Sequence, residues 1–124
     1  MDSNEGLADL KEVVREFSEK RDWDQYHNAK DLAIGIITEA SELLEHFRFK
    51  SEEEIDEIFS NNDSKEEVTE ELADVLFFVL RFAQIYDIDM VKGFKNKMKK
   101  NQAKYPVSEA KGSNEKYTEL GLDK

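Results

Sequence analysis

Apolar residues recur at spacings of three and four along most of the chain, which is the period of helices that bury one side. The first pattern covers residues 7–22, and the second begins after a polar and aromatic connector at 23–28, where Asn28 can cap the helix. The two stripes consist of Leu7, Leu10, Val14 and Phe17, then Leu32, Ile36, Ala40, Leu43 and Phe47. Both segments are therefore predicted to be amphipathic helices.

Two further helices are predicted in the second half of the chain. Asp63 or Ser64 can cap the third helix, which runs to about Tyr86. Asp89 can cap a fourth, which ends near Pro106, the only proline. The core side of the third helix consists of Val68, Leu72, Val75, Leu76, Val79 and Phe82. Residues 51–64 suit either a short helix or an ordered loop, and the tail at 107–124 is predicted to be irregular.

No segment alternates well enough to predict a strand, so the chain is predicted to be all-α. Short connectors between long helices favour antiparallel neighbours, and the simplest architecture is one domain, 1–124, with an antiparallel four-helix arrangement. The second and third helices are apolar over more of their circumference than a small monomer needs. We expect a homodimer or homotetramer; the alternative is that these two helices form the central pair of a monomeric bundle.

Composition narrows the classes of function. The net charge of −11 disfavours a nucleic-acid polymer as partner, because such binding depends on Lys and Arg that neutralise phosphates. No apolar stretch approaches the roughly 20 residues of a bilayer span, and the acidic N-terminus does not resemble a signal peptide. We therefore expect a cytoplasmic protein that engages no membrane. The absence of cysteine leaves oxygen ligands, or the two histidines, for any metal.

Two pairs of acidic residues are candidates for a metal site. Glu39 and Glu42 lie on the second predicted helix, and Glu71 and Asp74 on the third, each pair on one helical face. If these helices pack antiparallel, the pairs can face each other and supply the hard oxygen ligands that magnesium prefers. Such spacing is common among 29 acidic residues, but these four lie beside apolar stripes, where unpaired charge is costly. The alternative is a solvated helix edge, or salt bridges to lysines.

These acids resemble the pattern of the MazG-like all-α NTP pyrophosphatases, in which two acidic pairs on adjacent helices bind magnesium. Four further segments are similar to the dCTP pyrophosphatase branch of that family. They are Arg-Asp-Trp-Asp-Gln-Tyr-His at 21–27, Glu-Leu-Ala-Asp-Val-Leu at 71–76, Lys-Tyr-Pro at 104–106 and Lys-Tyr-Thr-Glu-Leu at 116–120. The resemblance extends over most of the chain.

The resemblance implies a role for each matching position. Glu39, Glu42, Glu71 and Asp74 would hold Mg²⁺, with Mn²⁺ as a possible substitute, and would be the catalytic residues. The nucleotide would be held by the connector residues Trp23, Asp24, Gln25, Tyr26 and His27. Phe49 and Phe78 would enclose the base, but they replace the branch's tryptophan and tyrosine, and Val14 replaces its histidine. The base preference is therefore less defined than the hydrolytic chemistry.

Lysines are concentrated at 90–104, which holds six lysines and no acid, whereas 51–74 holds eleven acids and one lysine. Within this basic segment Lys97, Asn101 and Tyr105 recur every four residues, with Lys104 beside them, and resemble the family's phosphate-binding side; the alternative is a solvated basic face. We expect Mg²⁺-dependent hydrolysis of a nucleoside triphosphate to the monophosphate and pyrophosphate, with dCTP or a modified dCTP as the leading candidate substrate. The alternatives are a non-enzymatic acidic helical interaction module, or a phosphohydrolase of this scaffold that acts on dUTP.

Overall fold

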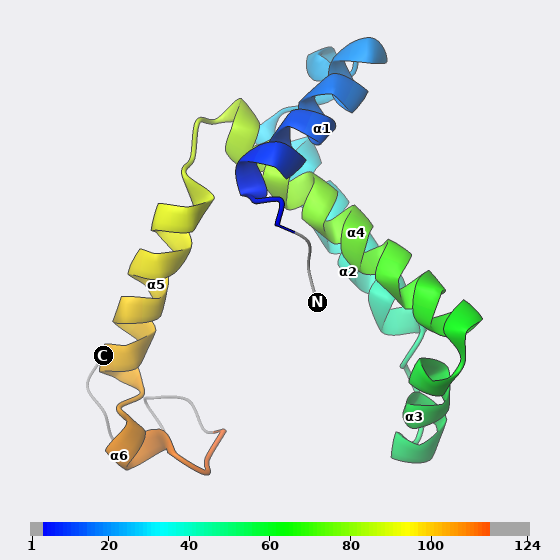
Figure 1. Cartoon of the computed structure of the whole chain (residues 1–124), viewed down its shortest axis with the longest axis vertical. Coiled ribbons are helices and arrows are strands. Elements are labelled where there is room, and N and C mark those ends of the chain that lie inside the picture. Colours follow the sequence, from blue (N-terminus) through cyan, green and yellow to red (C-terminus); the bar gives the residue numbers. More distant parts are fainter. Residues whose placement is uncertain (1–3, 115–124) are drawn as a thin grey trace. The chain divides into compact units, whose positions relative to one another are not determined.

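The computed structural model describes residues 4–114, and every regular element within that range is a helix (Figure 1). The all-α prediction is therefore confirmed. The elements are α1 (Leu7–Lys20), the 3₁₀ helix η1 (Asp24–Tyr26), α2 (Ala29–Glu45), α3 (Glu52–Ser60), α4 (Asn62–Ile85), α5 (Met90–Lys104) and α6 (Val107–Ala110). None of these helices has both the length and the apolar character needed to cross a bilayer.

The chain divides into two compact units, Met1–Asp87 and Ile88–Lys124. The first unit contains α1 to α4, and the second contains α5 and α6. The predicted fourth helix exists as α5, with its N-cap at Asp89 as expected. The single domain over 1–124 stays a prediction, as does a four-helix packing that includes α5.

Side-chain caps fix where the helices begin. Asn28 caps α2 as predicted, because its Oδ1 accepts a hydrogen bond of 2.9 Å from the backbone N–H of Asp31. Ser51 caps α3 reciprocally: its hydroxyl accepts from the N–H of Glu54, and the Glu54 carboxylate accepts from the N–H of Ser51. The ambiguous stretch at 51–64 is thus mostly helical.

Two predicted boundaries were wrong. The cap of α4 is Asn61, whose Oδ1 accepts from the N–H groups of Asp63 and Ser64, so the helix begins ahead of the two predicted caps. Ser64 instead uses its hydroxyl to donate to the Ile58 carbonyl, 2.6 Å away. The predicted irregular tail begins with the short helix α6, directly after Pro106, and residues 115–124 lie outside the described part of the chain.

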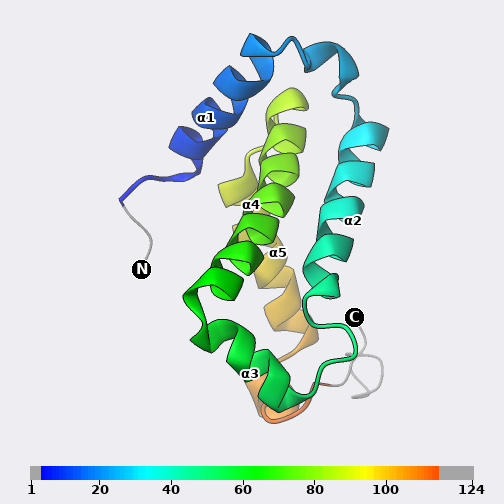
Figure 2. The same cartoon turned by 90° about the vertical axis from the view of Figure 1, so that its right-hand side faces the viewer.

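An antiparallel pair, α2 and α4, forms the centre of the first unit (Figure 2). The helix α1 packs on the C-terminal half of α4, where the Gln84 amide donates to the Lys11 carbonyl at 2.9 Å. The N-terminal part of α4 contacts α3. The predicted antiparallel contact between the second and third long helices is therefore present.

The buried apolar core of the described residues is small and consists of Val14, Leu32, Val68, Leu80 and Ala83. Leu72 and Leu76 were predicted on the core side, yet they are 53% and 41% exposed. The reason is that α1 and α2 cover only part of the circumference of α4, whose apolar stripe is wider than these two partners. The first unit therefore leaves apolar surface uncovered.

Gly35 allows α2 and α4 to approach closely at the centre of the pair. A Cβ atom at this position would lie 2.6 Å from two carbon atoms of the Phe78 ring. Glycine in a helix interior costs roughly 1 kcal/mol relative to alanine, so its presence here is explained by this contact. The ring of Phe78 fills the space that a side chain on Gly35 would need.

We predict that Gly35→Ala lowers the free energy of unfolding by about 1–3 kcal/mol, because the added methyl group displaces the Phe78 ring. The matched control is Gly93→Ala in α5, where no atom lies within 4 Å of the new Cβ. That change should raise the free energy of unfolding by up to about 1 kcal/mol. Urea denaturation followed by circular dichroism measures both, and an equal gain for the two variants would contradict the close packing.

Candidate active site

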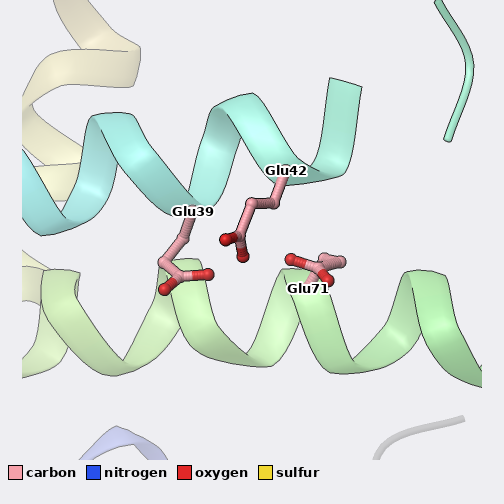
Figure 3. A group of neighbouring side chains, drawn as sticks. All are labelled: Glu39, Glu42 and Glu71. Carbon is pink, nitrogen blue, oxygen red and sulfur yellow. The ribbon is translucent and has the colours of Figure 1, made fainter. Parts of the chain in front are cut away.

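Three carboxylates from two helices converge between α2 and α4. Glu39 and Glu42 come from α2 and Glu71 from α4, and each offers an oxygen within 4.8 Å of the other two (Figure 3). The side chains of Glu39 and Glu42 reach from one ribbon toward the other, where Glu71 meets them. The three-residue spacing puts both α2 glutamates on the face that α4 covers.

This arrangement concentrates negative charge in a partly buried place. The Oε2 atoms of Glu39 and Glu71 are buried and have no hydrogen-bond partner among the described residues. A hydrogen bond with Glu42, burial, and the charges of Glu42, Asp74 and Glu71 together raise the pKa of Glu39 to about 7. Burial, followed by the hydrogen bond and charge of Glu42, also raises the pKa of Glu71. The charged forms of these groups are destabilised unless a cation joins them.

The donor set matches a hard divalent cation. Carboxylate oxygens are the ligands that Mg²⁺ and Mn²⁺ prefer, and two of the oxygens here lack a hydrogen-bond partner in the described part of the chain. Within residues 4–114, neither a lysine nor an arginine forms an ion pair with the three glutamates. The one basic neighbour is His46, whose Nε2 lies 3.9 Å from Oε1 of Glu71. Glu39, Glu42 and Glu71 are thus the residues that could hold a metal.

Asp74, the fourth predicted ligand, lies one turn after Glu71 on α4 but outside the group of converging oxygens. Its charge still acts on Glu39 and Glu71. Asp74 and Glu39 both line a pocket, described next, so they mark the side of the carboxylate group that opens to this pocket. The structure therefore brings three of the four acids together and places the fourth beside them.

A pocket of about 590 Å³ lies next to the carboxylate group, in the first unit. Apart from the two acids, its walls are apolar and come from α1, the connector and α4. The apolar lining residues are Leu10, Val13, Val14, Phe17, Trp23, Ala73, Leu76, Phe77, Phe78 and Leu80. One wall is aromatic: Phe17 makes edge-to-face contacts with Trp23 and Phe77, at centroid distances of 5.4 and 5.9 Å. Such a pocket suits a flat, partly apolar group that carries charge at one end.

Among the five predicted connector residues, Trp23 lines this pocket and the other four do not. The side chains of Asp24 and His27 contact Arg81 of α4 instead. Gln25 donates to the backbone and side chain of Asp22, whose φ of +54° turns the chain out of α1. Tyr26 is exposed. Substrate contacts of these four residues stay predictions.

The two predicted base-enclosing phenylalanines differ in their settings. Phe78 lines the pocket, where it packs against Gly35. Phe49 is 91% exposed and has a φ of +64°, with the guanidinium of Arg48 4.8 Å from the centre of its ring. Val14, at the position of the branch's histidine, lines the pocket and is buried. The structure therefore brings Phe78, but not Phe49, to the pocket of this chain.

The predicted phosphate-binding residues lie at the C-terminal end of α5, in the second unit. Lys97, Asn101 and Lys104 are on that helix, and Tyr105 is its C-cap. The Asn101 amide contacts the Met98 sulfur at 3.8 Å. The role of these residues toward phosphate stays a prediction, and the motif at 116–120 lies outside the described residues.

Several residues of this region were not predicted from the sequence as site residues, among them Phe17 and Phe77 in the pocket and Arg81 next to the connector. Phe17 was assigned only to the core stripe of its helix. Arg81 did carry a signal, because it is the only charged residue between Val75 and Ile85. A cation in the middle of an apolar helix predicts a buried partner elsewhere in the chain.

Residues 34–120 match the sequence model of the MazG-like family. The chain belongs to the MazG-like family. Its relatives include dCTP pyrophosphatase 1 of Rattus norvegicus, 33% identical over 114 residues, which are 92% of this chain and 67% of the relative. The Homo sapiens protein of the same name is 32% identical, again over 92% of this chain and 67% of its own length.

One solved structure is also similar to this chain. It is a pyrophosphatase from Archaeoglobus fulgidus, with a TM-score of 0.75 and 37% sequence identity. The match covers 86% of this chain and 97% of the archaeal one. The resemblance inferred from the sequence is therefore confirmed at the level of the family.

We predict that magnesium raises the melting temperature more at about pH 8 than at about pH 5.5, because metal ligands must be ionised. The raised pKa of Glu39 determines the direction of this effect. In the metal-free protein, the contribution of Glu39 to the free energy of unfolding is fully present below the ordinary pKa of a glutamate and is lost as the pH rises through about 7. Thermal melts with and without MgCl₂ measure the difference.

The controls for this experiment are two glutamine substitutions. Glu39→Gln should reduce the magnesium-induced rise at both pH values. Glu57→Gln, which changes an exposed acid of α3, should leave it as in the wild type. A rise that is the same at both pH values, or that survives Glu39→Gln, would rule out this carboxylate group as the metal site.

Proposed function

We propose that this protein is a Mg²⁺-dependent pyrophosphohydrolase that converts dCTP, or a modified dCTP, into the monophosphate and pyrophosphate. At the coarser level the chain is a nucleotide pyrophosphohydrolase, as a member of a family whose relatives are named for that activity. The observation that carries the proposal is the group of three carboxylates next to an aromatic pocket, one of whose lining residues is Glu39. A triphosphate needs the first feature, and a nucleobase suits the second.

The carboxylates of Glu39, Glu42 and Glu71, with Asp74 beside them, would hold the metal. When bound, a divalent cation neutralises phosphate charge and eases the ionisation of water. Water attacks the α-phosphorus, the bond from this phosphorus to the bridging oxygen of the β-phosphate breaks, and pyrophosphate leaves. The proton of the attacking water passes to Glu39 or Glu42, whichever carboxylate is not fully engaged by metal.

The pocket would select the base by stacking and by shape. Trp23 and Phe78 line it and offer aromatic faces, while Val14 and Leu80 close its apolar floor. Deoxycytidine is the leading candidate because the curated relatives are named dCTP pyrophosphatase. On the family resemblance, we assign the binding of the phosphates to Lys97, Asn101, Lys104 and Tyr105. We also propose that the protein acts in the cytoplasm, where this activity would sanitise the nucleotide pool.

Two other functions stay as alternatives. One is the same reaction on dUTP, which a panel of triphosphates would distinguish by the ratio of kcat/KM values. The other is an acidic helical module without enzymatic activity, which predicts that no triphosphate is consumed. The buried, unpartnered glutamate oxygens favour a metal-dependent enzyme, because a protein-binding surface gains nothing from burying them.

We predict that purified protein releases pyrophosphate and dCMP from dCTP when magnesium is present. Glu71→Gln should reduce kcat by about a hundredfold or more, because it removes one charged ligand of the metal. The helical circular dichroism should be unchanged. Ion-exchange chromatography identifies dCMP among the products, and a coupled pyrophosphate assay measures kcat.

The matched control is Glu70→Gln, which removes the neighbouring, exposed carboxylate outside the group. It should retain wild-type kcat and KM. Release of single phosphates from dCTP would remove the proposed reaction class, and full activity of Glu71→Gln would overturn the ligand assignment.

We further propose that the protein is a homodimer or homotetramer. The support is apolar surface that the first unit leaves uncovered: Ile34, Ile37 and Leu44 of α2 are exposed and lie on one side of that helix. Leu72 of α4, which does not line the pocket, is also exposed. Exposed apolar side chains grouped on one side of a helix are typical of surfaces that bind a partner.

We predict that Ile37→Glu, which places a charge at a side chain that is 66% exposed, dissociates the oligomer. The matched control is Val107→Glu, the same kind of change at an exposed apolar residue of α6, which should leave the assembly intact. Size-exclusion chromatography with light scattering measures the mass. A wild-type protein that elutes as a monomer at all concentrations would contradict the proposal.

A further inference from the structure

A buried arginine connects three elements around the aromatic pocket. Arg81 is only 1% exposed although it lies on α4 among apolar residues. Its Nε donates to Nδ1 of His27 at 2.9 Å, one terminal nitrogen donates to Oε1 of Gln84 at 2.6 Å, and the other pairs with the Asp24 carboxylate. A buried guanidinium is tolerated only when its donors are satisfied in this way.

The network extends from Arg81 to α1. Gln84 accepts from Arg81 with its amide oxygen and donates with its amide nitrogen to the Lys11 carbonyl, 2.9 Å away. The guanidinium thus joins α4 to the connector directly and to α1 through Gln84. These are the three elements that supply the aromatic wall of the pocket.

Trp23 is the pocket residue that depends most on this network. It directly precedes Asp24, and its ring makes edge contacts with Phe17 on one side and with His27, at a centroid distance of 6.3 Å, on the other. His27 also contacts Phe77, at 6.5 Å. Arg81 therefore contacts two residues next to Trp23, the adjacent Asp24 and the ring partner His27, although it does not line the pocket itself.

Arg81 lies far from the carboxylate group along the same helix. It follows Glu71 by ten residues, which corresponds to about 15 Å of helix rise. A change at Arg81 should therefore reach the base end of the pocket without disturbing the metal ligands. This separation allows its effect on base binding to be measured apart from the chemistry.

We propose that Arg81 is a positioning residue that sets the affinity of the pocket for the base, by holding Asp24 and His27 so that Trp23 forms the pocket wall. The proposal rests on the function proposed above. In this proposal Asp24 and His27 support Trp23 and do not line the pocket, because the Arg81 guanidinium binds Oδ1 of Asp24 and Nδ1 of His27.

Trp23 is the only tryptophan of the chain, so its fluorescence reports the wall directly. The variants are Arg81→Met, which keeps the length but not the charge, and Arg81→Lys, which keeps the charge with fewer donors. The matched control is Arg15→Met, an arginine of α1 that pairs with Glu12 and Glu19 outside the pocket. Each protein is titrated with dCMP, and its kcat, KM for dCTP and magnesium-induced thermal shift are measured.

For Arg81→Met we expect dCMP affinity to fall and KM for dCTP to rise, each by about tenfold or more, the scale on which a shifted supporting group acts. The kcat and the magnesium-induced shift should stay near wild type. Trp23 emission should move to longer wavelength and be quenched more by acrylamide. Arg81→Lys should recover part of the affinity, and Arg15→Met should match the wild type in every measurement.

Wild-type dCMP affinity and wild-type Trp23 emission in folded Arg81→Met would overturn the proposal. An equal loss of kcat and of the magnesium shift would also overturn it, because that result indicates general disruption of the fold. If Arg81→Met does not fold, Asp24→Asn and Arg81→Lys decide by the same criteria. If the wild type neither hydrolyses dCTP nor binds dCMP, the proposed function fails, while the Trp23 emission of the variants still tests the positioning role.

Discussion

The structure depends on one electrostatic constraint: three carboxylates that repel one another are held close together between α2 and α4. Glu39, Glu42 and Glu71 are close enough for one ion to contact all three, and two of their oxygens are buried without a partner. Packing of the helix pair keeps them there, with Gly35 admitting the Phe78 ring at the closest contact. A stable fold thus holds an electrostatically unfavourable group, which is typical of a site that binds a ligand.

The pocket beside this group explains part of the apolar surface that the first unit leaves exposed. Helix α1 covers only one end of α4, and the aromatic residues between them line a cavity of about 590 Å³. Full packing there would remove the space that a base needs. The buried Arg81 compensates by tying α1, the connector and α4 together with hydrogen bonds, so the wall of the pocket is held without being filled. Charge at one end and aromatic walls at the other match the two ends of a nucleotide.

The sequence predicted the helices well because their apolar spacing and caps are local signals: Asn28 and Asp89 cap the helices for which they were proposed. It predicted the acidic group from spacing plus an apolar setting, and three of the four acids converge. The start of α4 was missed because Asn61, Asp63 and Ser64 are all good caps, and hydrogen bonds decide between them. The Arg81 network was missed because it joins residues more than 50 positions apart. Periodicity carries no information about such contacts.

The most direct test of the account is to locate the metal itself. Crystals of the protein soaked in MnCl₂ should be measured at a wavelength where manganese scatters anomalously. The account predicts an anomalous peak between α2 and α4, within coordination distance of oxygens from Glu39, Glu42 and Glu71. A map with no peak there, with the three carboxylates ordered and manganese bound elsewhere or not at all, would contradict it.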